Sequence, residues 1–188
     1  MYNKIVIFGH SFISGLFHFL KSNGEKTKMN LGLENCTIRF LGEGSRKIDA
    51  LGYHDVHTIL QHEPDLLFIA MGDNDLRGNV HEICDKLLKW IGLFEDKIQK
   101  IIVCQTMPRC TASNHRYHFE EYNAKSALFN ELIAEKVLHE KHIYILNFEF
   151  IKSRNFKRFF DEKGIHLNGT GYFYYQKEIR NAVVALKD

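Results

Sequence analysis

The stretch DLLFIAMGDND, residues 65–75, decides the fold of this chain. Its first half is apolar without interruption from Leu66 to Met71, so a strand formed there would be covered on both faces. Its second half begins with Gly72, a turn former, and continues with three polar side chains. A buried strand that leads into a polar turn is typical of a parallel sheet whose strands end at a ligand-binding edge.

Four further apolar runs have the same character, and segments of helical periodicity lie between them. The expected strands cover residues 5–8, 37–40, 65–71, 101–104 and 143–146. The expected helices cover residues 11–20, 48–61, 80–98, 120–139 and 169–186. Pro64 marks the end of the second helix, because proline disfavours a helical conformation in the residue before it.

Buried strands separated by helices predict a parallel sheet with helices on both faces. Right-handed crossovers then favour a doubly wound, three-layer α/β/α sandwich. Among the common strand orders we expect 2-1-3-4-5, the order of flavodoxin-like folds. The sequence has no internal repeat, low-complexity tract or linker, and 188 residues suit one domain. We therefore expect a single domain over residues 1–188.

The composition narrows the class of protein and its partners. Hydrophobic residues make up 45% of the chain and charged residues 26%, as in soluble globular proteins. A net charge of +2 is too balanced to indicate a nucleic acid or a membrane surface. No stretch approaches the roughly 18 apolar residues of a membrane span, and no signal peptide is evident. Four cysteines without a CxxC pair favour reduced thiols and a cytoplasmic location.

Polar side chains follow the expected strands. The turns after the first four strands are residues 9–11, 42–45, 72–75 and 106–109, and His166 lies ahead of the last helix. Because the carboxyl ends of parallel strands share one edge of a sheet, we expect these turns to meet. A serine, two glycine-rich turns, an asparagine and a histidine on one edge are the parts of an acyl-transfer site.

Ser11 is the expected nucleophile and His166 its general base. Ser11 begins a helix, so its hydroxyl and N–H lie in the positive field of the helix start. A hydroxyl attacks a carbonyl only when a base takes its proton, and an imidazole can do so. The backbone amides of Ser11, Gly44 and Ser45 and the side-chain amide of Asn74 are the expected oxyanion donors. One such donor typically contributes about 3 to 4 kcal/mol.

Each of these residues also has an ordinary structural explanation. Ser11 by itself suits a helix N-cap, and the glycines of residues 42–44 suit a turn. Residues 72–75 suit an Asx turn, and a lone His166 is most often a satisfied surface histidine. It is their joint order and placement that favours a reactive site.

Together these blocks resemble the signature of the SGNH, or GDSL-like, hydrolase superfamily. Residues 9–11 are similar to its first block, Gly-Asp-Ser, and residues 42–45 to its second, which lines the oxyanion hole. Residues 72–75 are similar to the third block, Gly-x-Asn-Asp, and residues 164–168 to the fifth, Asp-Gly-x-His. The resemblance runs from residue 4 to about residue 175. It implies the SGNH fold, with a nucleophile at Ser11, a base at His166 and an oxyanion donor at Asn74.

A closer likeness concerns residues 9–12, 30–33 and 64–76, which look similar to SGNH domains of invertebrate animals. The esterase domain in the first protein of some LINE-type retrotransposons is of this kind. The likeness implies esterase activity on acetyl or lipid esters. It does not imply that this domain itself binds nucleic acid.

Three departures from the family pattern bear on the site. His10 stands where aspartate is usual, at a position that is neither nucleophile nor base. Ser45 stands where a second glycine is expected, and its amide can donate provided its backbone needs no positive φ. Lys163 stands where the family has the aspartate that orients the histidine, so Asp161 or Glu162 is expected to approach His166 Nδ1 instead. In a Ser-His-Asp enzyme, disabling this acid cost about 10⁴ in rate.

Arg109 follows the fourth strand and is a candidate substrate contact, although a solvated loop arginine is the more ordinary explanation. A second set of residues has ligand chemistry for zinc: Cys104, Cys110, His115 and His118. Their spacing matches no zinc finger or ribbon, so we expect no metal. No cofactor is expected either.

Three functions are open to this sequence. A serine esterase acting on a small-molecule or lipid ester fits the blocks best. Lys163 motivates the second, a catalytically weak or inactive binding module on the same fold. The βαβ order and the turn from Gly9 to Gly15 permit the third, a flavodoxin-like phosphate or nucleotide binder. The chain lacks the GxGxxG and GxxxxGK[ST] signatures, which weakens that third possibility.

Overall fold

A computed structural model describes residues 2–24, 28–110 and 119–186 of the chain. Its centre is a five-stranded sheet in which every neighbouring pair of strands is parallel. The strand order is β2-β1-β3-β4-β5, which confirms the expected order. The strands are β1 (Lys4–Gly9), β2 (Thr37–Gly42), β3 (Leu66–Ala70), β4 (Lys100–Cys104) and β5 (Ile143–Leu146).

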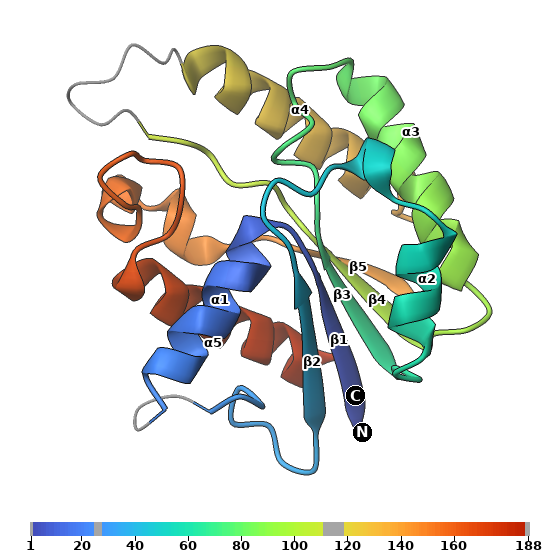
Figure 1. The fold of residues 1–188 in the computed structure, drawn as a ribbon. Helices are drawn as coiled ribbons and strands as arrows, with labels where there is room; N and C mark the ends of the chain where they lie inside the picture. Colours follow the sequence, from blue (N-terminus) through green and yellow to red (C-terminus); the bar gives the residue numbers. More distant parts are fainter. Residues whose placement is uncertain (1, 25–27, 111–118, 187–188) are drawn as a thin grey trace.

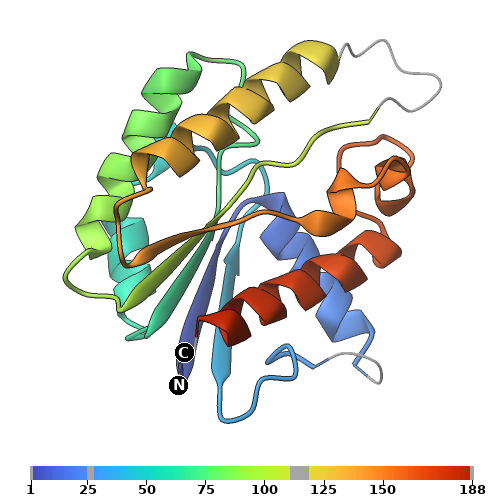
Figure 2. The same ribbon diagram turned by 180° about the vertical axis from the view of Figure 1, so that it is seen from behind.

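Helices cover both faces of this sheet (Figure 1). One face carries α1 (Ser11–Ser22) and α5 (Gly169–Ala185). The other carries α2 (Tyr53–Leu60), α3 (Val80–Ile91) and α4 (Phe119–Lys136), as the reverse view also shows (Figure 2). The expected three-layer α/β/α sandwich is therefore confirmed.

Each face of the sheet has its own hydrophobic core. Alternate side chains of a strand point to opposite faces, so Ile5 and Ile7 pack toward α1 and α5 while Val6 and Phe8 pack toward the other helices. All five residues of β3 are buried, as the uninterrupted apolar run predicted. Burying one such side chain contributes roughly 1.5 to 3 kcal/mol, so the central strands anchor both layers.

The prediction of one continuous helix over residues 48–61 is wrong, because two separate elements form there. Residues 48–50 form a 3₁₀ turn, η1 (Ile48–Ala50), and the backbone at Leu51 is extended. The helix α2 starts afresh after Gly52, whose N–H donates to the Asp55 carboxylate at 3.0 Å. The apolar spacing fits one helix, but this local cap divides the segment.

Later elements also differ from the prediction. The helix expected over residues 80–98 ends at Ile91 and is followed by a 3₁₀ turn, η2 (Gly92–Phe94). Two other 3₁₀ turns were not predicted, η3 (Glu149–Lys152) and η4 (Phe156–Phe159). They lie between β5 and α5, and they carry the chain to the turn that holds His166.

None of the described helices is long and apolar enough to span a membrane. Three of the four cysteines, Cys84, Cys104 and Cys110, are buried free thiols. Burial raises the pKa of the Cys84 thiol to about 11 and that of Cys104 well above its ordinary value. Thiols of this kind are unreactive.

Candidate active site

Ser11 and His166 meet at the carboxyl edge of the sheet. Ser11 is the first residue of α1, close behind β1, and His166 lies in the turn ahead of α5. The distance between Ser11 Oγ and His166 Nε2 is 3.1 Å. At this distance the hydroxyl donates its proton to Nε2 whenever that nitrogen carries none.

The cap of α1 leaves the Ser11 hydroxyl free for this contact. The N-cap residue is His10, and its Nδ1 accepts the N–H of Phe12 at 3.5 Å. Ser11 is therefore not the N-cap, which removes the ordinary explanation for a serine at this place. Among the described residues, no backbone carbonyl accepts the Ser11 N–H. That N–H is available at the positive end of the helix.

Asp161 lies beside the second ring nitrogen of His166. Its Oδ2 is 3.7 Å from His166 Nδ1, an ion-pair distance rather than a hydrogen bond. Its Oδ1 accepts the N–H of Ile165 at 3.1 Å and that of His166 at 3.4 Å. The turn thus folds around the Asp161 carboxylate. Glu162 and Lys163 are exposed, and no described contact joins Glu162 to His166.

Gly164 allows this turn to pack against the segment after β4. Its φ is +68°, and a Cβ built there would lie 1.7 Å from the carbonyl oxygen of Cys110. The Cys110 N–H donates to the Gly164 carbonyl at 3.0 Å. Only glycine combines the left-handed backbone with so close an approach.

The expected oxyanion donors differ in which of two cavities they line. Asn74 lines the same small cavity as Ser11 and His166. One of its Nδ2 hydrogens is donated to the Arg46 carbonyl at 2.9 Å, which leaves the other available. The amides of residues 44 and 45 donate to no backbone carbonyl among the described residues.

The expectation that Ser45 needs no positive φ is wrong. Its φ is +59°, so its backbone does occupy the left-handed region. This conformation costs a residue with a Cβ roughly 1 kcal/mol. Gly44, by contrast, has open space where a Cβ would stand and no positive φ. Ser45 lines a larger cavity next to the small one, whereas Gly44 is not among the residues that line either.

Arg46 holds the turn after β2 in place, a role that the sequence analysis missed. Its Nη1 donates to the carbonyls of Gly9 at 3.1 Å and Leu41 at 2.7 Å. The guanidinium lies over the ring of Phe8, with 4.3 Å from Cζ to the ring centre. The ends of β1 and β2 are thereby tied to the turn that presents Ser45.

A second histidine–aspartate pair lies buried next to Ser11, and the sequence analysis missed it too. His10 Nε2 is 2.8 Å from Asp73 Oδ2, and both residues are buried. Because Nδ1 of His10 accepts from Phe12, Nε2 carries the proton and donates to the carboxylate. The sequence signal is His10 itself, which stands where the family pattern has aspartate.

Asp73 also accepts hydrogen bonds from two other segments, the loop after β4 and helix α4. Its Oδ1 accepts the N–H of Met107 and the hydroxyl of Tyr122, each at 3.1 Å. Burial by itself raises the pKa of Asp73, but His10 and these two hydrogen bonds hold the pKa below its ordinary value. The carboxylate therefore stays ionised as a fixed structural group.

Ser11 and His166 line a small cavity of about 20 Å³, enough for one water-sized group. An adjoining cavity of about 510 Å³ shares four wall residues with it: Asp73, Asn74, Arg109 and Tyr122. Arg109, expected from the sequence as a candidate contact, lies at this border. Its guanidinium stacks over the Tyr122 ring at 3.9 Å, and its Nη2 donates to the Asp73 carbonyl at 3.3 Å.

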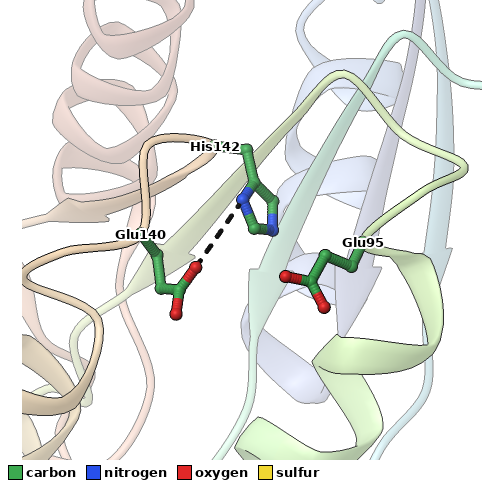
Figure 3. Close-up of side chains that lie close together, drawn as sticks. All are labelled: Glu95, Glu140 and His142. Atoms are coloured by element: carbon green, nitrogen blue, oxygen red, sulfur yellow. Dashed lines mark ion pairs between the residues drawn. The ribbon is translucent and has the colours of Figure 1, made fainter.

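His115 and His118, two of the zinc ligands weighed from the sequence, lie outside the described residues. Elsewhere, Glu95, Glu140 and His142 bring possible ligand atoms within 4.8 Å of one another (Figure 3). This cluster lies just before β4 and β5, at the sheet edge opposite to Ser11. Both glutamates are exposed. Exposed acidic groups are common without an ion, so the cluster by itself indicates no metal site.

The same fold occurs in several ester-cleaving enzymes of known structure. A lipase/acylhydrolase from Enterococcus faecalis matches with a TM-score of 0.75 and 18% identity, over 96% of this chain and 95% of that one. A GDSL-like lipase from Bacteroides thetaiotaomicron matches with a TM-score of 0.70 and 18% identity, over 98% and 89% of the two chains. The chain has the fold of the GDSL-like hydrolases.

An acetylxylan esterase from Geobacillus stearothermophilus has this GDSL-like hydrolase fold as well, with a TM-score of 0.66 and 11% identity over 95% of this chain and 93% of that one. No protein-family model matches the sequence, and no curated protein matches it. One fold hosts many chemistries, so the activity has to be argued from the residues at the site.

Proposed function

We propose that the chain is a serine esterase that hydrolyses a carboxylic ester through an acyl-enzyme on Ser11. His166 is the general base, and Asp161 is the carboxylate that orients it. The observation that carries this proposal is the 3.1 Å between Ser11 Oγ and His166 Nε2. It joins two distant parts of the chain at the edge where open parallel sheets bind ligands.

In the first half of the reaction, Ser11 Oγ attacks the carbonyl carbon of the ester and its proton passes to His166 Nε2. The imidazolium then directs its Nδ1–H toward Asp161, whose carboxylate at 3.7 Å favours the positive charge. The bond between the carbonyl carbon and the alcohol oxygen breaks, and the alcohol takes the proton from Nε2. The acyl group stays on Ser11.

In the second half, water attacks the acyl-enzyme. His166 Nε2 takes a proton from the water and returns it to Ser11 Oγ as the carboxylic acid leaves. The cavity of about 20 Å³ between these side chains is large enough for that water.

Both steps place negative charge on the former carbonyl oxygen. We assign its stabilisation to the Ser11 N–H, the amide of Gly44 or Ser45, and the free N–H of Asn74. Among the described residues, no backbone carbonyl accepts the N–H of Ser11, Gly44 or Ser45. One of the two Nδ2 hydrogens of Asn74 is donated to the Arg46 carbonyl, and the other is available. Removal of one such donor costs roughly 3 kcal/mol in the transition state.

The substrates we propose are acetyl or lipid esters, the class implied by the resemblance to invertebrate SGNH domains. A binding module without turnover is the second candidate. The 3.7 Å separation between His166 Nδ1 and Asp161 favours it, because an acid beyond hydrogen-bond reach fixes the imidazole less firmly. In that case the same cavities hold a ligand that is not cleaved.

Hydrolysis of p-nitrophenyl acetate tests the proposal. The wild type is compared with Ser11→Ala and with Ser22→Ala, an exposed serine at the other end of α1. We expect p-nitrophenol release by the wild type and Ser22→Ala, and only background release by Ser11→Ala. Equal rates for the wild type and Ser11→Ala would remove the esterase. No release by any of the three proteins favours the binding module.

A further inference from the structure

The larger cavity beside Ser11 has a cationic wall. Its charged lining consists of Lys47, Arg77, Arg109 and Lys125 against the carboxylates of Asp73 and Glu121. Asp73 is buried and engaged with His10, and Glu121 pairs with Lys125 at 2.9 Å. Among the described residues, no carboxylate lies within ion-pair distance of the other three cations.

Arg109 is the most firmly held of these three. Its backbone N–H donates to Asn123 Oδ1 at 2.8 Å, and its guanidinium is stacked on Tyr122. Of the five N–H donors of a guanidinium, one on Nη2 donates to the Asp73 carbonyl, and the group also interacts with the Tyr122 hydroxyl, which leaves further donors for a ligand. A partly buried cation without a carboxylate is screened less by solvent than an exposed one, so it attracts an anion more strongly.

This wall lies within reach of the reactive hydroxyl. Asn74, Arg109 and Tyr122 line both the large cavity and the small one that holds Ser11 and His166. An ester whose carbonyl lies against Ser11 can therefore extend past Arg109 into the larger cavity. Its volume of about 510 Å³ falls within the usual range of small-molecule sites, about 300 to 1,000 Å³.

We propose that the ester cleaved at Ser11 carries an anionic group, a phosphate or a carboxylate, bound by Lys47, Arg77 and Arg109. The guanidinium fork suits either group, because both offer two oxygens to parallel N–H donors. The chemistry rests on the proposed esterase function. The binding of the anion does not, since it needs no turnover.

Two matched pairs of esters test the proposal. Acetylated glycerol 3-phosphate against monoacetylglycerol places the charge on the alcohol, and mono-4-nitrophenyl glutarate against 4-nitrophenyl pentanoate places it on the acyl group. We expect the anionic member of at least one pair to have a kcat/KM about tenfold higher or more. This preference should shrink in about 0.5 M NaCl, because salt screens charges at the rim of an open cavity.

Arg77→Gln and Lys47→Gln should each lower the preference roughly three- to tenfold, as expected for one partly screened charge. The control is Lys89→Gln, which removes the same charge from an exposed site on α3 that does not line the cavity. This variant should leave kcat/KM unchanged for both the anionic and the neutral ester of each pair. Equal kcat/KM for the anionic and neutral members of both pairs overturns the proposal, even where neutral esters are hydrolysed.

A binding measurement separates this proposal from the esterase function. Calorimetric titration with glycerol 3-phosphate, and with glutarate as the carboxylate probe, is carried out on the wild type and on Lys47→Gln/Arg77→Gln. Binding that weakens at least tenfold in the double variant supports the anion site, whether or not any ester is cleaved. If neither glycerol 3-phosphate nor glutarate binds to the wild type, the anion site is overturned. Binding without hydrolysis of any ester removes the esterase and leaves the anion site.

Discussion

The edge of the sheet carries two histidine–aspartate pairs, and they differ in burial, distance and partners. His10 and Asp73 are buried and 2.8 Å apart. His166 and Asp161 are 3.7 Å apart, and their side chains are 47% and 34% exposed. The first imidazole contacts protein groups through both ring nitrogens. The second presents Nε2 to the hydroxyl of Ser11.

The difference teaches that the surroundings of a histidine–aspartate pair decide whether it is suited to a structural role or to the catalytic role that we propose. Asp73 joins the turn after β3 to Met107 and to Tyr122 of α4, so its pair fixes the geometry of the edge. The His166 ring is half-exposed, contacts the Ser11 hydroxyl and borders a cavity, which is the setting that our proposed general base requires.

The largest effect on activity is expected at the exposed histidine. His166→Asn should lower kcat/KM for p-nitrophenyl acetate about 10⁴-fold or more, because Ser11 loses its base. The half-exposed ring packs little, so the midpoint of thermal unfolding should shift by no more than about 2 °C. Steady-state kinetics measures kcat/KM, and circular dichroism measures the midpoint of thermal unfolding. A loss of less than tenfold contradicts this assignment.

The largest effect on stability is expected at the buried aspartate. Asp73→Ala leaves the N–H of His10 and two further donors without an acceptor, and should lower the free energy of unfolding by about 3 to 5 kcal/mol. Asp161→Ala, in the exposed pair, should cost about 1 kcal/mol or less. Urea unfolding of both variants makes the comparison. Equal losses would show that burial does not distinguish the two pairs.

The turn that carries His166 should depend on Gly164. Gly164→Ala forces a Cβ against the Cys110 carbonyl at positive φ, and should cost roughly 2 to 4 kcal/mol with a fall in activity. Gly44→Ala is the matched control, since no atom lies within 4 Å of its added Cβ. It should change stability by no more than about 0.5 kcal/mol. Similar values for the two variants would mean that the turn adapts freely.

Asp161→Asn tests the looser of the two pairs through activity. We expect a loss of roughly 10- to 100-fold, smaller than the 10⁴ of a hydrogen-bonded triad acid, because 3.7 Å exceeds hydrogen-bond reach. Glu162→Gln, one residue along, should change the rate less than about twofold. A full 10⁴-fold loss would show that the pair closes during the reaction. An unchanged rate would remove Asp161 from the site.

Asp75 is a third carboxylate at this edge; it is buried, and its Oδ1 accepts the N–H of Ile48 at 3.0 Å. Burial, the largest influence, raises its pKa to about 6, although the N–H of Ile48 acts in the opposite direction. The folded chain therefore binds more protons here than the unfolded chain between about pH 4 and pH 6. Stability falls as pH rises through this window, by roughly 2 kcal/mol. Urea unfolding at about pH 4.5 and 7 should show this fall in the wild type and not in Asp75→Asn; equal slopes would contradict it.

The layers of this fold could be predicted because they follow from apolar runs. The run 66–70 is buried at every position, and such strands leave few arrangements between covering helices. The break in residues 48–61 could not be predicted, because the apolar spacing suits a continuous helix. What divides it is the contact between Gly52 and Asp55, a local cap that competes with helix propagation.

At the candidate site, placement could be predicted from strand ends but detailed geometry could not. The contact between Ser11 and His166 closes a gap of 155 positions, and only the fold fixes it. The approach of Asp161 depends on a turn shaped by the packing of Gly164 on Cys110, a contact between segments distant in sequence. The contact between His10 and Asp73 could not be predicted either, because it also joins segments that are distant in sequence.

Labelling with a fluorophosphonate tests most directly whether His166 makes Ser11 Oγ nucleophilic. The wild type is treated with the reagent, and the adduct is located by mass spectrometry of its peptides. We predict one adduct, on Ser11, formed at least about 10³-fold more slowly in His166→Asn. An adduct on another residue, or labelling of His166→Asn at the wild-type rate, would contradict the account.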